Sequence, residues 1–350
     1  MKASVLHGVG DLRYETVPDP EPAPGEAVVR VGACGVCGSD IPRIFSKGTY
    51  SFPTIPGHEL AGTVARVGGG VDEALVGRRV TVFPLIPCRR CAMCEAGEYA
   101  LCADYSYLGS RCDGGFAELV RAPAWNLLPV PDGVSIEEAA MTEPAAVALH
   151  ALKRGGMSSG ECVLIVGAGT IGVVVALWAR ILGASKVLLV DIDQRKLDFA
   201  RSLGFEHVAD AGGENITEWG NRLTGSGVDL SVEAAGHAAA LDQCLRTTRP
   251  MGRVVLLGNP AGDMAVAQHA YWAILRKQLT LIGTWNSAYQ PTPPSEWSMV
   301  LEHMASGQLN LKPLITHRVG LHGLSEILAQ MRDRAVFANK VMYVGPAEPQ

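Results

Sequence analysis

The sequence predicts a two-domain α/β protein that combines a β-barrel with a doubly wound parallel sheet. Residues 1–148 are rich in Gly and Pro and contain short β-like runs such as Ala27–Val31 and Gly62–Val67. This texture is typical of a compact barrel with long loops. Further along, buried strands alternate with helical stretches, which is typical of a parallel sheet covered on both faces. With 350 residues, the chain is long enough for two such domains.

The order of the expected elements sets the domain boundaries. A helix-favouring, Ala-rich stretch, Glu137–Lys153, leads into the second domain. The Pro-rich segment Gln290–Pro294 later breaks the alternation, and a further helix and the strand Lys340–Val344 are expected to return to the first domain. We predict one domain from residues 1–148 and 286–350, and an inserted domain from residues 149–285. The buried strands expected in the inserted domain are Val163–Val166, Lys186–Val190, Asp229–Glu233, Arg253–Gly258 and Leu279–Ile282.

Composition and charge exclude several classes of protein. Hydrophobic residues at 48% and charged residues at 19% describe a globular chain. A net charge of -5, without a Lys/Arg cluster, argues against a nucleic-acid partner, which needs a concentrated basic surface. The N-terminus reaches Asp11 without the apolar core of a secretory signal. We therefore expect a cytoplasmic protein.

One stretch has to be weighed as a membrane span, because Cys162–Ala179 contains 18 residues without a charge. It carries three glycines at a meaningful spacing and is closed by Arg180. These features favour a buried strand followed by a buried helix. We therefore expect a soluble protein without a membrane partner.

The nine cysteines are an odd number and cluster locally in a chain without an export signal. A disulfide framework is typical of much smaller secreted chains. The pattern instead indicates thiolates that bind metals in a reducing compartment.

An apolar strand runs directly into a G-x-G-x-x-G motif at Gly167–Gly172 and then into a helix. The first glycine allows the tight turn, the second lets the backbone approach a pyrophosphate, and the third lets the helix pack on the strand. Asp191 ends the next strand, 19 residues past Gly172. This context favours a dinucleotide site over a coincidental glycine-rich turn. The predicted cofactor residues in the motif are Gly167, Gly169, Thr170, Ile171 and Gly172.

Asp191 distinguishes between the two dinucleotides. A carboxylate there accepts hydrogen bonds from the ribose hydroxyl groups of NAD and repels the extra phosphate of NADP. Arg195 and Lys196 lie nearby and could soften that repulsion, although solvated residues on a helix face are the simpler interpretation. We expect NAD as the cofactor, with Arg195 at the edge of its site.

The motif Cys88-x2-Cys91-x2-Cys94-x7-Cys102 indicates a structural zinc site. Four thiolates this close can complete a tetrahedron around Zn²⁺ and leave no open position. The main alternative is an iron–sulfur cluster. The fourth cysteine comes too late for the bacterial ferredoxin pattern, and no proline follows it.

A second set of possible metal ligands is dispersed along the chain: Cys37, His58, Glu59 and Glu143. Each has an ordinary structural explanation, as a buried thiol, a core histidine or a carboxylate at a helix start. No spacing rule connects residues so far apart, so the pattern alone leaves this site open.

The chain resembles the zinc-containing medium-chain alcohol dehydrogenases over nearly its full length. Within that family it is most similar to the polyol branch, which includes the sorbitol and galactitol-1-phosphate dehydrogenases. The resemblance implies a GroES-like catalytic domain that carries the zinc lobe at residues 88–102, and an inserted Rossmann domain that binds NAD. A homodimer or homotetramer is expected. The segments that carry the resemblance are Cys37–Phe45, Gly57–Glu59, Gly109–Glu118, Ile274–Thr280 and Glu296–Trp297.

The resemblance also implies a catalytic zinc, the second of two per chain, held by Cys37, His58 and Glu143. Glu59 is an alternative or additional ligand, and Glu143 stands where classical alcohol dehydrogenases use cysteine. Zinc would lower the pKa of a bound secondary alcohol, whose hydride then moves to NAD. Ser39 is the candidate for the first proton relay, or alternatively a turn hydroxyl bonded to the backbone. Asp40 is expected to orient His58.

The expected substrate is a polyol phosphate. The resemblance implies that Arg43 stands where sorbitol dehydrogenase presents a pocket tyrosine, and guanidinium can bind phosphate through two parallel hydrogen bonds. Arg111 and Lys47 are further candidates for the same cleft, and Trp285 and Asn286 are expected to line the substrate pocket. The main hypothesis is oxidation of galactitol 1-phosphate at C5 to tagatose 6-phosphate.

Two alternative functions stay open. Arg43 could be a solvated surface residue, and the enzyme could then act on an unphosphorylated polyol or a cyclitol. The segment Thr284–Tyr289 departs slightly from the pattern of the polyol branch, and because these positions should line the substrate pocket, the departure leaves the exact substrate open. A different class of function is a non-catalytic zinc protein that binds NAD.

Overall fold

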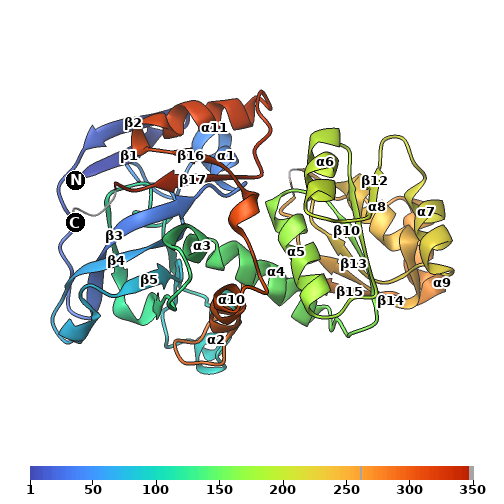
Figure 1. The fold of residues 1–350 in the computed structure, drawn as a ribbon, viewed down its shortest axis with the longest axis horizontal. Coiled ribbons are helices and arrows are strands. Elements are labelled where there is room, and N and C mark those ends of the chain that lie inside the picture. The colour runs from blue at the N-terminus through green and yellow to red at the C-terminus, as the bar shows by residue number, and fades with distance from the viewer. Residues whose placement is uncertain (261, 347–350) are drawn as a thin grey trace. The chain divides into compact units, whose positions relative to one another are not determined.

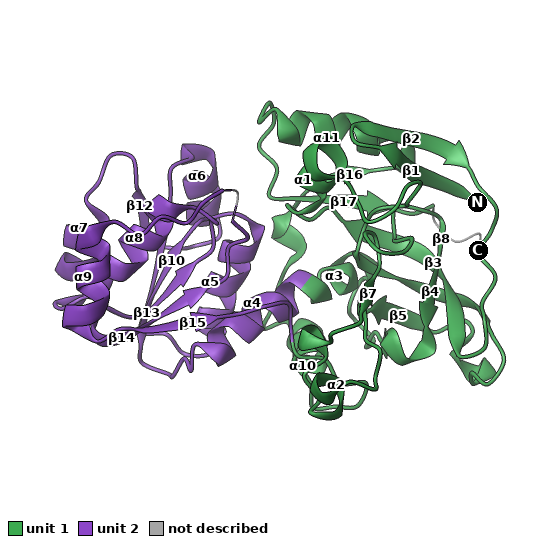
Figure 2. Cartoon of the chain, turned by 180° about the vertical axis from the view of Figure 1, so that it is seen from behind, with its two compact units in different colours: residues 1–143, 288–350 green, residues 144–287 purple. Residues whose placement is uncertain are grey.

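The computed structural model describes residues 1–260 and 262–346. The chain divides into two compact units, which Figures 1 and 2 show. Unit 1 contains residues 1–143 and 288–350, and unit 2 contains residues 144–287. The division falls inside helix α4 (Thr142–Arg154), whereas the sequence placed the boundary after residue 148.

Unit 1 is built on a seven-stranded sheet that branches at β3 (Glu26–Gly35). β4 (Glu59–Val67) pairs with β3 along one edge, while β8 (Leu119–Pro123) and β17 (Lys340–Val344) share the other edge. Two register shifts between β3 and β4 bend the pair, because bulges increase local twist and curvature. The predicted barrel is confirmed. The remaining strands of unit 1 are β1 (Lys2–Gly8), β2 (Asp11–Thr16), β5 (Arg79–Val82), β6 (Leu85–Ile86), β7 (Ser106–Tyr107), β9 (Leu127–Pro129) and β16 (Ile315–Val319).

Helices close this sheet over one hydrophobic core. α11 (Leu324–Arg332) places Leu324 and Leu328 against core residues of the N-terminal hairpin such as Leu6. All three side chains are fully buried. The other helical segments of unit 1 are short, apart from α10: α1 (Asp40–Pro42), η1 (Arg43–Lys47), η2 (Glu73–Leu75), α2 (Ala92–Glu95), η3 (Tyr99–Leu101), η4 (Ala124–Asn126), α3 (Ile136–Ala140), α10 (Glu296–Ala305), η5 (Lys312–Leu314) and η6 (Leu321–Gly323).

The helix-favouring stretch Glu137–Lys153 forms two helices, α3 and α4, with a break at Met141. Pro144 has no N–H group, so it cannot donate the hydrogen bond that would continue α3 past Ala140. Proline is tolerated in the first turn of the helix that follows. The break places Glu143 in the first turn of α4, where its side chain is buried.

Unit 2 is a six-stranded parallel sheet with the order β12-β11-β10-β13-β14-β15. The chain order reverses beside β10 (Cys162–Val166), which creates the crevice where dinucleotides bind in folds of this type. The predicted doubly wound sheet is confirmed. Its other strands are β11 (Lys186–Asp191), β12 (His207–Asp210), β13 (Val228–Glu233), β14 (Thr248–Leu256) and β15 (Thr280–Gly283).

Helices cover both faces of this sheet. α7 (Ile216–Thr224), α8 (Ala238–Thr247) and α9 (Gln268–Lys277) contribute buried side chains to one core cluster. α5 (Thr170–Ile181) packs against α4, where the indole of Trp178 donates a 3.0 Å hydrogen bond to the carbonyl of Ala145. α6 (Gln194–Ser202) contacts β11 and β12.

The uncharged stretch Cys162–Ala179 is a buried strand followed by a buried helix, as predicted. Within residues 1–260 and 262–346, no helix is long and apolar enough to cross a bilayer. Five of the six strands of unit 2 overlap the predicted strands, and β12 was missed. β12 is a four-residue edge strand with only one fully buried residue, so it lacks the continuous apolar run that predicts a central strand.

Candidate active site and metal centres

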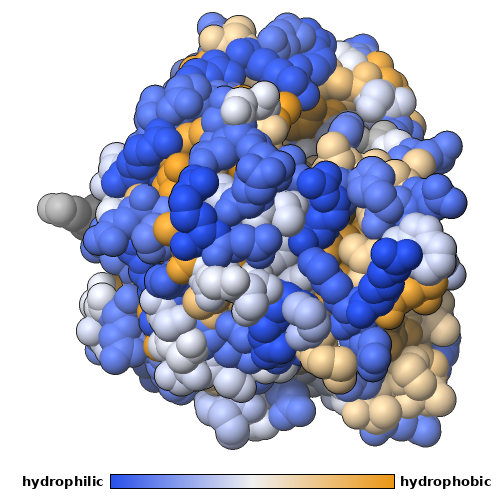
Figure 3. Space-filling model, turned by 90° about the vertical axis from the view of Figure 1, so that its right-hand side faces the viewer, coloured by the Kyte–Doolittle hydropathy of each residue, from blue (hydrophilic) through white to orange (hydrophobic). Residues whose placement is uncertain are grey.

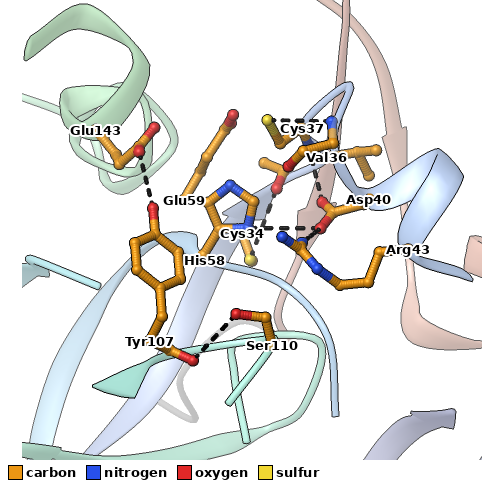
Figure 4. Close-up of polar contacts among 12 residues, drawn as sticks. Cys34, Val36, Cys37, Asp40, Arg43, His58, Glu59, Tyr107, Ser110 and Glu143 are labelled. Carbon is orange, nitrogen blue, oxygen red and sulfur yellow. Dashed lines mark hydrogen bonds and ion pairs between the residues drawn. The ribbon is translucent and has the colours of Figure 1, made fainter. Parts of the chain in front are cut away.

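The antiparallel pairing of β3 with β4 brings three dispersed residues of unit 1 together. Gly35 and Glu59 are partners in the register, so Cys37 lies just past the end of β3 and His58 just before the start of β4. Ligand atoms of Cys37, His58 and Glu59 lie within 4.8 Å of one another. Figure 4 shows the three side chains next to one another. A side chain at position 35 would meet the Glu59 carboxylate, because a Cβ there would lie 2.2 Å from Oε2.

A tight turn orients Cys37 and His58 through the buried carboxylate of Asp40. Asp40 accepts a 2.9 Å hydrogen bond from the Cys37 N–H through Oδ2 and a 2.6 Å bond from Arg43 through Oδ1. His58 Nδ1 lies 3.5 Å from Asp40 Oδ1, within ion-pair distance but without the geometry of a hydrogen bond. Burial alone would raise the pKa of Asp40, but the charges of His58 and Arg43 hold it below the usual value.

The proposed orienting role of Asp40 therefore has a geometric basis. Burial alone would lower the pKa of His58, but the Asp40 charge raises it well above the usual value. A ligand histidine commonly faces a carboxylate through one ring nitrogen and the metal through the other. Ser39 is half-buried beside Cys37, its N–H lies 3.5 Å from the Cys37 sulfur, and its hydroxyl makes no cap hydrogen bond to α1.

Glu59 is neutralised by Lys340, which comes from the far end of the sequence. Lys340 Nζ lies 2.5 Å from Glu59 Oε2 and donates a 3.0 Å hydrogen bond to the carbonyl of Val36. The two side chains are 2% and 1% exposed, so the pair is inaccessible to water. Burial would lower the pKa of Lys340, but the Glu59 charge outweighs it and raises the pKa. The pair holds one carboxylate oxygen of Glu59 in place.

Glu143 lies beside this group without joining it. Among the described residues, the clustered ligand atoms are those of Cys37, His58 and Glu59. The hydroxyl of Tyr107 donates a 3.2 Å hydrogen bond to Glu143 Oε1 (Figure 4). Burial raises the pKa of Glu143 to about 7, against the opposing charge of His58.

The four cysteines of the lobe come together as their spacing predicts. Their sulfur atoms lie within 4.8 Å of one another. Hydrogen bonds from backbone N–H groups lower the pKa of Cys91 to about 6, and the N–H of Ala103 has the largest effect. Burial raises the pKa of Cys94 to about 12. The ring of Tyr99 in the lobe packs edge-on against the ring of Trp125, with centres 5.0 Å apart, which anchors the lobe to the rest of unit 1.

Both groups fit zinc by their donor chemistry. The four thiols of the lobe match a closed structural site, and the sulfur, imidazole and carboxylate donors of Cys37, His58 and Glu59 match a catalytic one. His58 Nδ1 has no hydrogen-bond partner in the described chain, although it faces a carboxylate. A metal on the other ring nitrogen would favour the neutral ring, with its proton on Nδ1 toward Asp40.

The glycine motif has the geometry that a dinucleotide needs. Gly167 has φ of +113°, and a Cβ there would lie 2.9 Å from the backbone of Ala234. A Cβ at Gly172 would lie 1.8 Å from the Gly167 carbonyl oxygen, so only glycine lets α5 approach β10. Gly169 has open space, with no atom within 4 Å of a Cβ. Thr170 and Ile171 form the first turn of α5.

Asp191 ends β11 and lies next to this loop. Its Oδ2 accepts a 2.8 Å hydrogen bond from the N–H of Ala168 and lies 3.2 Å from Lys196 Nζ. Arg195 instead pairs with Asp193 at 2.9 Å. Lys196 is therefore a cation in contact with Asp191.

The predicted substrate residues lie in different environments. Arg43 is 18% exposed and bound to Asp40, while Lys47 is exposed at the end of η1. Arg111 is exposed, with its guanidinium 4.1 Å and 4.4 Å from the ring centres of two tyrosines, Tyr50 and Tyr105.

Trp285 and Asn286 belong to unit 2, where the indole is 58% exposed and Asn286 has a φ of +57°. Tyr289 in the same segment is a core residue of unit 1. Its ring stacks on Phe83 at 4.1 Å, and its hydroxyl donates to the carbonyl of Trp125.

Sequence reasoning missed two residues of the site, Tyr107 and Lys340. Lys340 begins an otherwise apolar strand. Because lysine is almost never fully buried unless it is paired, a lysine in a buried strand predicts an acidic partner such as Glu59. Tyr107 lies between the cysteine lobe and the motif Gly109–Glu118, and no pattern in the sequence distinguishes it.

Comparison with known proteins identifies the family. Residues 23–132 match the alcohol dehydrogenase GroES-like domain, and residues 170–306 match the zinc-binding dehydrogenase domain. The galactitol 1-phosphate 5-dehydrogenase of Escherichia coli (strain K12) is 34% identical over 312 residues, 89% of this chain and 90% of that protein. The sorbitol dehydrogenase of Bombyx mori is 34% identical over 338 residues, covering 93% and 94%.

Solved structures agree with this assignment. The crystal structure of galactitol-1-phosphate dehydrogenase from Escherichia coli superposes with a TM-score of 0.92 at 33% identity, over 98% of this chain and 100% of that one. A zinc-binding dehydrogenase from Sinorhizobium meliloti 1021, solved with NADP, has a TM-score of 0.89 at 28% identity over 98% of each chain. An alcohol dehydrogenase from Escherichia coli CFT073, solved with NADH, has a TM-score of 0.89 at 26% identity over 98% and 99%.

Proposed function

The chain belongs to the zinc-binding alcohol dehydrogenases, and from this membership we propose that it oxidises a secondary alcohol of a polyol phosphate with NAD. Members of the family are dehydrogenases with zinc and a nicotinamide dinucleotide as cofactors, and its relatives here include polyol dehydrogenases. The leading substrate is galactitol 1-phosphate, oxidised at C5 to tagatose 6-phosphate.

One observation carries the proposal: the metal-binding group has a carboxylate as its third donor and a second carboxylate beside it. Cys37, His58 and Glu59 form the group, and Glu143 stands next to it. The family resemblance suggested Glu143 as the ligand and Glu59 as the alternative. The distances support the opposite assignment, with Glu59 as the standing ligand and Glu143 free for the substrate.

The residues around the group have separate roles in the proposed reaction. Zinc bound there would act as a Lewis acid toward the substrate hydroxyl. Asp40 orients His58, and Lys340 compensates the charge of Glu59. The hydroxyl proton of the substrate leaves through Ser39 or Glu143 to solvent. The hydride on the same carbon goes to NAD, so the alcohol becomes a ketone and NAD becomes NADH.

Arginine side chains support a phosphorylated substrate. Arg43 has five N–H donors and uses Nη1 for Asp40, so the others can bind an anion. Arg111 lies on the turn that starts at Tyr107, because its backbone N–H donates a 2.9 Å hydrogen bond to the Tyr107 carbonyl. Two tyrosine rings hold its guanidinium in place. An unphosphorylated polyol is the second candidate, since the sorbitol dehydrogenase relative is equally similar.

We propose NAD as the preferred dinucleotide because Asp191 places a carboxylate at the edge of the glycine loop. Lys196 lies against that carboxylate and reduces its repulsion of a 2′-phosphate. We therefore expect NADP to be used less efficiently than NAD but not to be excluded.

A panel of galactitol, sorbitol, inositol and the phosphates of the hexitols, each assayed by NADH absorbance, tests the substrate. The proposal requires kcat/KM to be highest for a hexitol phosphate. Higher values for the free polyols or for inositol would establish the unphosphorylated alternative. Protein that carries two zinc ions and binds NADH but turns over nothing in the panel would favour the non-catalytic alternative.

We also propose that the enzyme is a homo-oligomer in which a second copy covers β15 and α9. Among the described residues, β15 ends the strand order of its sheet, so its outer edge has no partner strand there. Tyr271, Trp272 and Leu275 on α9 are between 45% and 56% exposed, and Leu281 on β15 is 39% exposed. Figure 3 looks onto unit 2, and apolar surface gathers at the lower right of that face. Light scattering distinguishes monomer, dimer and tetramer.

The cysteines support a cytoplasmic location. All nine are free thiols, and four of them form the closed group of the lobe. An oxidising compartment would convert neighbouring thiols of that group to disulfides and release its metal. We therefore propose that the protein works where thiols stay reduced.

A further inference from the structure

Tyr107 contacts both sides of the candidate catalytic site. Its hydroxyl donates to Glu143 Oε1 at 3.2 Å, and its ring packs edge-on against the His58 imidazole with centres 5.6 Å apart. Figure 4 shows the phenol pointing from the end of β7 toward the start of α4, with Glu59 and His58 alongside. One side chain therefore touches a candidate metal ligand and the carboxylate that stands beside the group.

We propose that Tyr107 is a positioning residue that holds Glu143 out of the metal ligand set and keeps this carboxylate available to the substrate hydroxyl. The inference rests on the proposed function, because it assumes a zinc ion at Cys37, His58 and Glu59. It goes further by assigning the separation of the two glutamates to one hydrogen bond.

The number of donors explains why such a restraint is needed. Cys37, His58, Glu59 and Glu143 together would supply four protein ligands, which is the closed arrangement of a structural site. A catalytic site has three protein ligands and a position for the substrate. One of the two carboxylates must therefore be kept from the ion.

The two carboxylates are restrained in different ways. Glu59 faces Lys340 at 2.5 Å, yet its ligand atom stays within 4.8 Å of those of Cys37 and His58. Glu143 is in the first turn of α4, and its Oε1 is directed to the Tyr107 hydroxyl instead. A glutamate has several rotatable bonds, so without this hydrogen bond the side chain could turn toward a nearby cation.

The test replaces Tyr107 with Phe in the zinc-loaded enzyme and measures two quantities. The first is the rate at which the more labile zinc moves to a chromogenic chelator, and the second is kcat with KM for NAD. Tyr107→Phe keeps the ring against His58 and removes only the hydroxyl. We expect zinc release to slow by roughly tenfold or more, because the charge-assisted hydrogen bond from Tyr107 no longer competes with the zinc ion for the Glu143 carboxylate. We expect kcat to fall while KM for NAD stays the same.

A double variant and a matched tyrosine control complete the design. Glu143→Gln in the Tyr107→Phe background should return zinc release to the wild-type rate, because an amide is a poor zinc ligand. Tyr14→Phe should change neither quantity, since Tyr14 is 49% exposed and packs near His322.

Zinc release from Tyr107→Phe that is unchanged or faster than in wild type would overturn the inference. Faster release with a lower melting temperature would mean that the residue only supports the fold. Wild-type protein without a labile zinc would overturn the proposed function itself and this inference with it, and metal analysis before the kinetics identifies that case.

Discussion

Replacing Arg43 with Ala tests whether the enzyme recognises a phosphate. Arg43 is only 18% exposed, so a charge-assisted hydrogen bond from its guanidinium to phosphate would be weakly screened. Losing such a contact costs about 1.5–3 kcal/mol, which corresponds to a loss of roughly ten- to a hundredfold in kcat/KM for the phosphate ester.

The same change disturbs the site for every substrate. Arg43 Nη1 donates 2.6 Å to Asp40, a fully buried carboxylate that faces His58. Removing one partner of a buried pair is strongly unfavourable, so activity on a free polyol should also fall. The informative quantity is therefore the ratio of kcat/KM for the hexitol phosphate to kcat/KM for the free hexitol. We expect this ratio to fall by roughly ten- to a hundredfold in Arg43→Ala.

Two further variants separate recognition of phosphate from support of Asp40. Arg43→Lys keeps a cation beside Asp40 but loses the planar fork that binds phosphate through two parallel bonds, so the ratio should fall less than in Arg43→Ala. Arg111→Ala leaves Asp40 untouched and measures the contribution of the second arginine. An unchanged ratio in Arg43→Ala would refute the assignment of Arg43. A wild-type ratio near one would refute the phosphorylated substrate as a whole.

Three other results follow from the structure. Metal analysis of purified protein should find two zinc ions per chain. The Glu59→Ala variant should lose one ion and its activity but keep the zinc of the lobe. The Cys91→Ser variant should lose the structural ion, and calorimetry should show a lower thermal stability. Asp191→Ser should narrow the difference in kcat/KM between NAD and NADP, and equal wild-type values for the two would contradict the role of Asp191. The buried Glu143 binds its proton more tightly when folded, with a pKa of about 7, than when unfolded, so zinc-free protein should lose roughly 3 kcal/mol of stability as pH rises from about 4.5 to 7. Glu143→Gln should remove that part of the pH dependence in denaturant titrations, and identical profiles for the two proteins would contradict the burial argument.

Local patterns in the sequence predicted the features that depend on nearby residues. Five strands of unit 2 follow from apolar runs between turn residues, and the two glycine contacts at β10 follow from a motif of six residues. The four lobe cysteines, Cys88–Cys102, come together within one short segment, which is the spacing typical of a structural zinc site. The end of α3 also had a local signal, because Pro144 has no N–H group to donate the hydrogen bond that would extend α3 past Ala140.

Features that depend on distant residues had no such signal. Lys340 meets Glu59 across 281 positions, and only the pairing of β17 with the end of β3 brings them together. Tyr107 reaches Glu143 across 36 positions because the fold places the end of β7 beside the first turn of α4. Burial determines both contacts, and burial follows from the complete fold rather than from spacing along the chain.

The spacing of Cys37, Asp40 and Arg43 connects metal binding to substrate recognition. The three residues are three positions apart on one turn, so Asp40 binds the Cys37 N–H through one oxygen and Arg43 through the other. The Asp40 oxygen that Arg43 contacts also faces His58 Nδ1 at 3.5 Å. Arg43 therefore has two functions in the proposed enzyme, because Nη1 supports the carboxylate that faces His58 while its other N–H groups can bind an anion. Recognition of a phosphate and orientation of the ligand His58 depend on the same side chain, since a carboxylate beside a ligand histidine fixes the orientation of its ring.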